Sequence, residues 1–160
     1  MKINDLVENP LLTAAFDETL RLASGASSAR TVKSPTQLGD KILQKDTKLI
    51  MPYRQLHSDA EVFGPQVREF HPERFLDNEA LGRSPNFKPF GGGVTYCSGR
   101  FIAKREVLYF VAQLLHKYDV GLADPNQGLP RLDEQKPSLG VLEPIKGDDT
   151  LITIKPKSVS

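Results

Sequence analysis

Cys97 is the only cysteine of the chain, and it lies between a glycine-rich stretch and the longest amphipathic run. A cysteine near a helix N-terminus meets free backbone N–H groups and the positive end of the helix dipole, which favour a thiolate over a thiol. A thiolate held there can ligate iron, including haem iron, or act as a nucleophile. The three glycines at 91–93 and Gly99 permit positive φ angles and close approach to a bulky group. The alternative is an inert, buried cysteine.

Three other chemistries fit the residues poorly. A phosphate-binding G-x-G-x-x-G pattern fails at Tyr96, and no Gly-Lys-Ser/Thr follows. A cysteine nucleophile would need His57, His71 or His116 as its base, and no spacing singles one out. A structural zinc site needs about four ligands, which one cysteine and three scattered histidines supply poorly. Iron ligation and an inert thiol therefore fit the residues best, and a cysteine nucleophile stays a less favoured alternative.

Composition bounds the class of protein. The net charge of +1 gives no strong attraction to nucleic acid or to acidic membranes, so we expect no nucleic-acid partner. Hydrophobic residues make up 39% of the 160 residues, as in ordinary globular domains. One cysteine cannot form an internal disulfide. We find neither a membrane-spanning apolar segment nor the apolar core of a signal peptide. One domain over residues 1–160 is expected.

The residue pattern predicts helices joined by short strands. Asn9 and Pro10 open a helix over residues 11–22, on which Glu18 and Arg21 share a face. Residues 26–32 and 47–51 form extended segments of a small antiparallel sheet. A short helix over 58–63 is capped by Ser58. Further strand-like pieces lie at 120–122, 139–142 and 150–154, with a turn at 146–149.

Two segments flank the cysteine. Residues 70–89 show no period and are expected to be ordered but irregular, pinned by four aromatic side chains: Phe70, Phe75, Phe87 and Phe90. Residues 98–118 form the long helix, whose apolar stripe comprises Ile102, Ala103, Val107, Phe110, Val111, Leu114, Leu115 and Tyr118. The predicted fold class is mainly α with small antiparallel β-sheets.

Three motifs, in order along the chain, resemble those of the cytochrome P-450 superfamily. Phe90-x-x-Gly93-x-x-x-Cys97-x-Gly99 resembles its haem-binding signature. Glu18-x-x-Arg21 resembles its E-x-x-R helix motif, and residues 72–75 resemble its P-E-R-F segment. The E-x-x-R pattern alone arises often by chance, so its weight comes from the order of all three. The resemblance implies the C-terminal, haem-binding part of that fold, which is incomplete here.

The resemblance assigns roles around the cofactor. Cys97 would be the thiolate ligand of the iron of haem b, with Phe90 packed beside it. Gly91, Gly93 and Gly99 would allow the turn and the close approach. Arg30 would face a haem propionate; where many members carry Arg or His as a second propionate partner, this chain has Thr95.

A charge network and a substrate wall are also implied. The network would lock the loop below the haem, and its members are Glu18, Arg21 and Arg74. Losing one member strands a buried charge, at a cost of ~3–5 kcal/mol. Substrate contacts are expected from two small-residue segments: Ala26, Ser27 and Ser28 in the first, Leu139 and Gly140 in the second.

The implied activity of the full-length enzyme is that of a haem-thiolate monooxygenase, an oxidoreductase that oxidises an apolar lipid, sterol or secondary metabolite. It would use molecular oxygen and reducing equivalents from an NADPH-dependent reductase. That partner could dock on a basic surface, which is equally an ordinary charged helix face: Lys88, Arg100, Lys104 and Arg105. A full-length eukaryotic member would reside at the endoplasmic reticulum membrane; this chain has no membrane anchor.

Two alternatives to the monooxygenase remain. One is a haem-thiolate isomerase or dehydratase of the same fold. The other is a truncated, non-catalytic remnant, because the distal helix that activates oxygen in the family is not found here. Residues 29–33 and 139–144 resemble most the branch that holds sterol hydroxylases and prostacyclin synthase.

Overall fold

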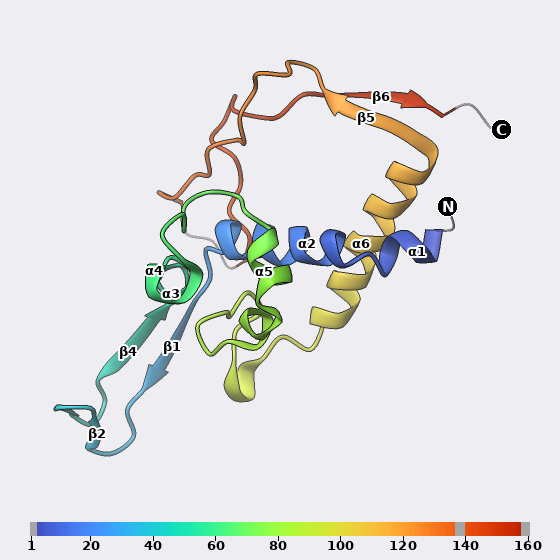
Figure 1. Cartoon of the computed structure of the whole chain (residues 1–160). Coiled ribbons are helices and arrows are strands. Elements are labelled where there is room, and N and C mark those ends of the chain that lie inside the picture. Colours follow the sequence, from blue (N-terminus) through green and yellow to red (C-terminus); the bar gives the residue numbers. More distant parts are fainter. Residues whose placement is uncertain (1–2, 137–139, 158–160) are drawn as a thin grey trace.

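Two long helices dominate the computed structural model, which describes residues 3–136 and 140–157 (Figure 1). The short α1 (Ile3–Val7) leads into α2 (Pro10–Ala23), and α6 (Arg100–Lys117) contacts both. The α2 start is as predicted, because the Asn9 side chain accepts the N–H groups of Leu11 and Leu12 at 2.9 and 3.3 Å. No helix in the described part of the chain is long and apolar enough to cross a membrane.

The described strands form three two-stranded antiparallel sheets. β1 (Ser27–Thr31) pairs with β4 (Lys48–Pro52), as expected, and projects from the helices. A hairpin of β2 (Thr36–Leu38) and β3 (Lys41–Leu43), which the sequence analysis missed, extends it. β5 (Tyr118–Leu122) pairs with β6 (Ile152–Pro156). The predicted strand at 139–142 is wrong in its described part, where Val141 makes one isolated bridge to Ser24.

The stretch between β4 and the cysteine is more helical than expected. It holds α3 (Tyr53–His57), α4 (Ala60–Phe63), α5 (Glu73–Asp77) and the 3-10 helix η1 (Glu79–Arg83). The predicted Ser58 cap is wrong. The side chain of Asp59 caps α4 by accepting the Glu61 N–H at 3.0 Å. Ser58 instead ends α3, and its N–H donates to the backbone carbonyl of Arg54. Helices this short leave little periodic signal in a sequence.

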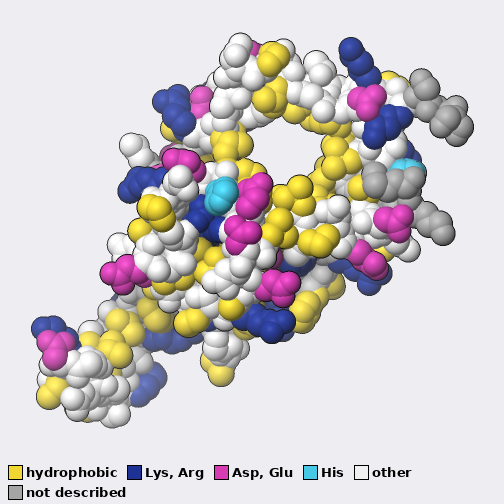
Figure 2. Space-filling view, in the orientation of Figure 1, with side chains coloured by type: hydrophobic (Ala, Val, Ile, Leu, Met, Phe, Trp, Pro, Cys, Tyr) yellow, Lys and Arg dark blue, Asp and Glu magenta, His cyan; other side chains and the backbone are white. Residues whose placement is uncertain are grey.

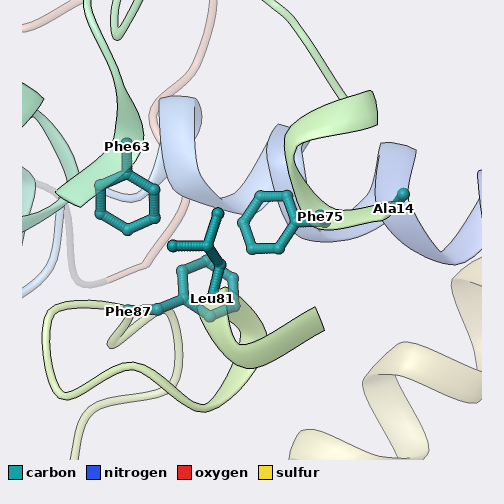
Figure 3. Close-up of a cluster of buried hydrophobic side chains, with 5 residues drawn as sticks. All are labelled: Ala14, Phe63, Phe75, Leu81 and Phe87. Atoms are coloured by element: carbon teal, nitrogen blue, oxygen red, sulfur yellow. The ribbon is translucent and has the colours of Figure 1, made fainter. Parts of the chain in front are cut away.

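The hydrophobic core lies where these short helices meet α2 (Figure 3). The Phe75 ring lies 5.2 Å from that of Phe87 and 6.4 Å from that of Phe63, measured between centroids. Phe75 and Phe87 therefore pin the segment, as predicted. Phe70 does not, because 39% of its surface is exposed. The cluster consists of Ala14, Phe63, Phe75, Leu81 and Phe87.

The predicted apolar stripe of α6 is not its buried face. The buried residues are Leu108 and Ala112, one turn apart and outside that stripe, whereas Ile102 and Phe110 are 64% and 68% exposed. An apolar period identifies a helix face but not which part of it receives a neighbour. Here α6 packs against α1 and α2, and Leu108 and Ala112 are the residues that become buried on it.

Candidate functional site

A buried charge cluster joins α2 to α5. Its members are Glu18, Arg21 and Arg74, and at most 8% of each is exposed. Glu18 accepts from Arg21 at 2.7 and 2.8 Å and from Arg74 at 3.1 Å. The i, i+3 spacing on α2 places Glu18 and Arg21 together, and the short helix α5 brings Arg74 to the same carboxylate. The structure thus unites the three residues of the expected network.

Backbone groups satisfy the rest of the charge cluster. Arg21 donates to the carbonyl of His57 at 2.8 Å, and Glu18 accepts the His71 N–H at 3.0 Å. Arg74 donates to the carbonyls of Phe63 and Gln66. A buried charge is tolerable only when it is paired and fully hydrogen-bonded, and this cluster meets that condition. It fixes the chain of residues 57–71 against α2.

The Cys97 loop, residues 88–99, folds back on itself. The Cys97 N–H donates to the carbonyl of Phe90 at 3.1 Å, which brings the two ends of the glycine stretch together. Gly91 and Gly93 have φ angles of +80° and +65°, a region that favours glycine. Gly99 has a φ of −79° and needs no such freedom. It caps α6, and a Cβ there would lie 3.8 Å from Cys97 Sγ.

Arg30 on β1 reaches this loop. Its Nη2 donates to Thr95 Oγ1 at 2.7 Å and its Nη1 to the carbonyl of Ala29 at 2.8 Å. Thr95 in turn donates to the carbonyl of Gly92 at 3.4 Å. The threonine at a position where a charged propionate partner was expected therefore holds the guanidinium of Arg30 against the loop.

A cleft of about 360 Å³ opens beside the exposed Cys97. It brings most predicted cofactor and substrate residues together, although Leu139 lies outside the described residues. Its wall includes Phe90, Gly91, Thr95, Cys97, Ala26, Ser27, Ser28 and Gly140. Arg30 lines an adjoining cleft of about 540 Å³ with Lys88, Gly92 and Gly93.

The residues around Cys97 fit a thiolate-ligated haem. An exposed sulfur is a suitable soft ligand for iron, and Arg30 is a suitable partner for a carboxylate. The described residues contain no group of three or more His, Cys, Asp and Glu side chains that could hold another metal ion. The small wall residues and the positive-φ glycines leave room beside the sulfur for a bulky group.

The histidines do not support a cysteine nucleophile. His57 is fully buried, and its Nε2 accepts the backbone N–H of Lys88 at 2.8 Å, so this nitrogen is not available to take a proton from Cys97. His71 is exposed and lies 3.2 Å from Glu73. The structural place of His57 was missed by sequence reasoning, because its partners Arg21 and Lys88 are 36 and 31 residues away.

The expected basic surface is partly engaged in internal contacts. Arg100 stacks between Tyr96 and Phe101, with its guanidinium carbon 4.3 and 4.1 Å from their ring centroids, and donates to the Cys97 carbonyl at 2.9 Å. Lys104 forms an ion pair with Asp17 at 3.2 Å, which ties α6 to α2. Charges held in this way contribute less to an external docking surface.

An exposed cysteine in a glycine-containing loop and a buried Glu–Arg–Arg cluster, within helices and small antiparallel sheets, are the features that the resemblance to the cytochrome P-450 superfamily implies. The cytochrome P450 family profile matches residues 1–151, and the chain belongs to this family. The cyanobacterial structure described as "Retinoic acid bound cyanobacterial CYP120A1" superposes with a TM-score of 0.76 at 22% identity, covering 98% of this chain and 35% of that one. The predicted family and fold class, part of the P450 fold, are therefore confirmed.

Curated relatives come from fungi and mammals. The chain is 33% identical to the monooxygenase poxD of Penicillium oxalicum, over 78% of this chain and 27% of the relative. It is 34% identical to a bifunctional cytochrome P450/NADPH–P450 reductase of Aspergillus oryzae, over 79% of this chain and 12% of the relative. The human 7-alpha-hydroxycholest-4-en-3-one 12-alpha-hydroxylase is 30% identical over 89% of this chain and 32% of the relative. This similarity is in line with the expected sterol-hydroxylase branch. The chain thus spans about a third or less of these relatives.

Proposed function

We propose that this chain forms the thiolate side of the haem site of a P450 monooxygenase, with Cys97 as the iron ligand. The observation that carries the proposal is the exposed Cys97 in a cleft wall beside the Arg30–Thr95 pair. When bound, haem would supply the redox-active iron that oxygen activation requires. The chain would hold it through the Cys97 sulfur and through Arg30 toward a propionate, with Phe90, Gly91, Gly93 and Gly99 shaping the loop.

The substrate class proposed for the full-length enzyme is an apolar lipid, sterol or secondary metabolite. In support, the human relative is named for a sterol substrate, and 89% of this chain is similar to 32% of that relative. Within the described part of the chain, the cleft residues Ala26, Ser27, Ser28 and Gly140 are small and would leave space for such a molecule.

The proposed electron donor is an NADPH-dependent reductase. The relative from Aspergillus oryzae is named as a fusion of a P450 with such a reductase. Lys88 in the Cys97 loop and Arg105 on α6 offer positive charge for docking. The endoplasmic-reticulum location expected of a full-length eukaryotic member stays a prediction, and the names of the relatives do not favour the isomerase or dehydratase alternative.

Haem reconstitution tests the proposal. The purified chain is mixed with haem, reduced, exposed to carbon monoxide and compared with its Cys97→Ser variant and with Ser98→Ala, an exposed neighbour that should behave as wild type. We expect a thiolate-type absorption band that Cys97→Ser abolishes. Absence of haem uptake by the wild-type chain would instead support the non-catalytic remnant. Rapid labelling of Cys97 by iodoacetamide, with loss of a hydrolytic activity, would support the nucleophile.

A further inference from the structure

His57 lies between the charge cluster and the Cys97 loop and bonds to both. Its backbone carbonyl accepts from Arg21 Nη1 at 2.8 Å, and its Nε2 accepts the backbone N–H of Lys88, the first residue of the loop, at 2.8 Å. The ring packs on Phe87, with 5.6 Å between centroids. The side chain is fully buried. One residue therefore contacts both parts of the candidate site.

The hydrogen bonds determine the state of the imidazole. Because Nε2 accepts, the proton of the neutral ring must sit on Nδ1. Nδ1 is buried and finds no hydrogen-bond partner among the described residues. Burial lowers the pKa of His57 to about 4, so the ring stays neutral at physiological pH. A buried imidazole with one nitrogen left without a hydrogen-bond partner lowers the stability of the fold. That this cost is accepted points to a role for the bond to Lys88.

The bond to Lys88 leads directly to the cysteine. The carbonyl of Lys88 accepts the Gly91 N–H at 3.1 Å, which forms the turn holding Phe90. The carbonyl of Phe90 accepts the N–H of Cys97. The side chains of the charge cluster, by contrast, bond to residues 57–71 and to one another. A hydrogen-bonded path from the cluster to the Cys97 loop therefore runs through His57.

We propose that His57 is a positioning residue for the Cys97 loop. Its neutral imidazole accepts the N–H of Lys88 while its carbonyl accepts Arg21, so the buried cluster sets the position of the loop through this residue. The inference deepens the proposed function, since it concerns the loop that would ligate the iron. Its test needs no haem, so failure to bind haem and failure of this inference are distinguishable.

Amide hydrogen exchange at Lys88 in the haem-free chain tests the bond. His57→Phe keeps a ring against Phe87 but removes the acceptor, whereas the Oε1 of His57→Gln can reach the place of Nε2. The Phe87 amide, which donates to Ser84 at 3.0 Å, is an internal reference. In His57→Phe we expect exchange at Lys88 to accelerate about tenfold relative to Phe87. His57→Gln should restore the wild-type ratio.

The control separates positioning from loss of stability. Leu81→Ala truncates a core side chain of the same hydrophobic cluster without touching Lys88. It should speed exchange at Lys88 and Phe87 alike. An unchanged Lys88-to-Phe87 ratio in His57→Phe, or an equal change in Leu81→Ala, would overturn the proposal. If His57→Phe does not fold, nitrogen NMR of the wild-type imidazole decides: protonated Nδ1 and bare Nε2 are expected at pH 7, and a protonated Nε2 contradicts the bond.

The rate at which Cys97 is alkylated reports on the conformation of the Cys97 loop. The chain has one cysteine and it is exposed, so its rate of reaction with iodoacetamide is measurable directly. The rate should change in His57→Phe and return to the wild-type value in His57→Gln. The same rate in the wild type and in His57→Phe would show that the loop does not depend on His57.

Discussion

At the residue scale, Glu18 stabilises two arginines in a site that excludes water. Its carboxylate is 0% exposed and accepts from Arg21, from Arg74 and from the backbone of His71. Because each charge is desolvated, the cluster is weak as a source of net stability but strongly destabilising when broken. The same residue sets where two segments distant in sequence meet.

Glu18→Gln should destabilise the fold by about 3–5 kcal/mol, because it leaves two buried guanidinium groups without a counter-charge. Urea unfolding followed by circular dichroism measures the change in free energy of unfolding. Glu73→Gln is the matched control, since Glu73 is half exposed and its ion pair among the described residues is with His71 across 3.2 Å; its effect should stay within about 0.5 kcal/mol. Similar effects of both substitutions would contradict the role of Glu18 as the shared counter-charge of the two buried arginines.

Thr95→Val should weaken haem binding by about tenfold, because Arg30 loses a charge-assisted hydrogen bond that holds its guanidinium at the loop. Thr95→Ser keeps the hydroxyl and should bind haem as the wild type does. Titration of the two variants with haem, followed by absorption, measures the affinities. Equal affinity of Thr95→Val and Thr95→Ser would show that this bond does not orient Arg30 for the cofactor.

At the element scale, the site depends on contacts between short helices and loops. α3 ends at His57 and meets the Cys97 loop, while Lys104 on α6 pairs with Asp17 on α2. Burial raises the pKa of Asp17, and the pair with Lys104 offsets only part of that shift. The two helices that flank the site are therefore joined by a partly desolvated ion pair.

The contact of α3 with the loop predicts a pH dependence of stability. The pKa of His57 falls from 6.5 to about 4 on folding, chiefly through burial. Between these values the unfolded chain binds a proton that the folded chain does not, so the free energy of unfolding should fall as the pH drops from 6.5 to 4. The full change is about 3 kcal/mol, and none is expected from this group above pH 7.

Urea titrations at several pH values measure that dependence. Carboxylates titrate near pH 4 as well, so the decisive quantity is the difference between the wild type and His57→Gln, which lacks only this group. The two curves should run parallel above pH 7 and diverge below pH 6.5. Parallel curves down to pH 4 would mean that His57 does not lose its proton affinity on folding.

At the scale of the whole molecule, the chain is open rather than close-packed. Its accessible surface is 11,668 Å² for a mass of 17.8 kDa, whereas a compact monomer of that mass exposes about 8,000 Å². Figure 2 shows hydrophobic side chains over much of the visible face and around an opening through the molecule. Val94, Phe101 and Phe110 are among the most exposed. Surfaces of this kind usually meet another surface.

This openness predicts dye binding by the isolated 160-residue chain in its folded state. The fluorescence of anilinonaphthalene sulfonate should rise on addition of the chain, and Phe110→Gln should lower the signal because it removes an exposed apolar ring of α6. Gln113→Ser, a polar change at an exposed position of the same helix, should leave the signal unchanged. A chain that binds no dye without added denaturant would contradict the open structure.

The sequence determined the long helices and the family, for local reasons. Asn9 and Pro10 act within one helical turn, and the spacing of Glu18 and Arg21 follows from the helix period. The motif around Cys97 is contiguous, so it was visible without a fold. The short helices α3, α5 and η1 were missed because helices of one or two turns depend more on tertiary packing than on propensity.

Only the tertiary structure decided which of these residues meet. Nothing in the sequence placed the Arg30 guanidinium against Thr95, 65 residues away, or the imidazole of His57 against the N–H of Lys88. The buried row of Leu108 and Ala112 on α6 likewise follows from what α1 and α2 cover, and the apolar period of the helix predicted a different face. Local spacing sets backbone conformation, whereas long-range contacts follow from burial and hydrogen-bond satisfaction across the whole fold.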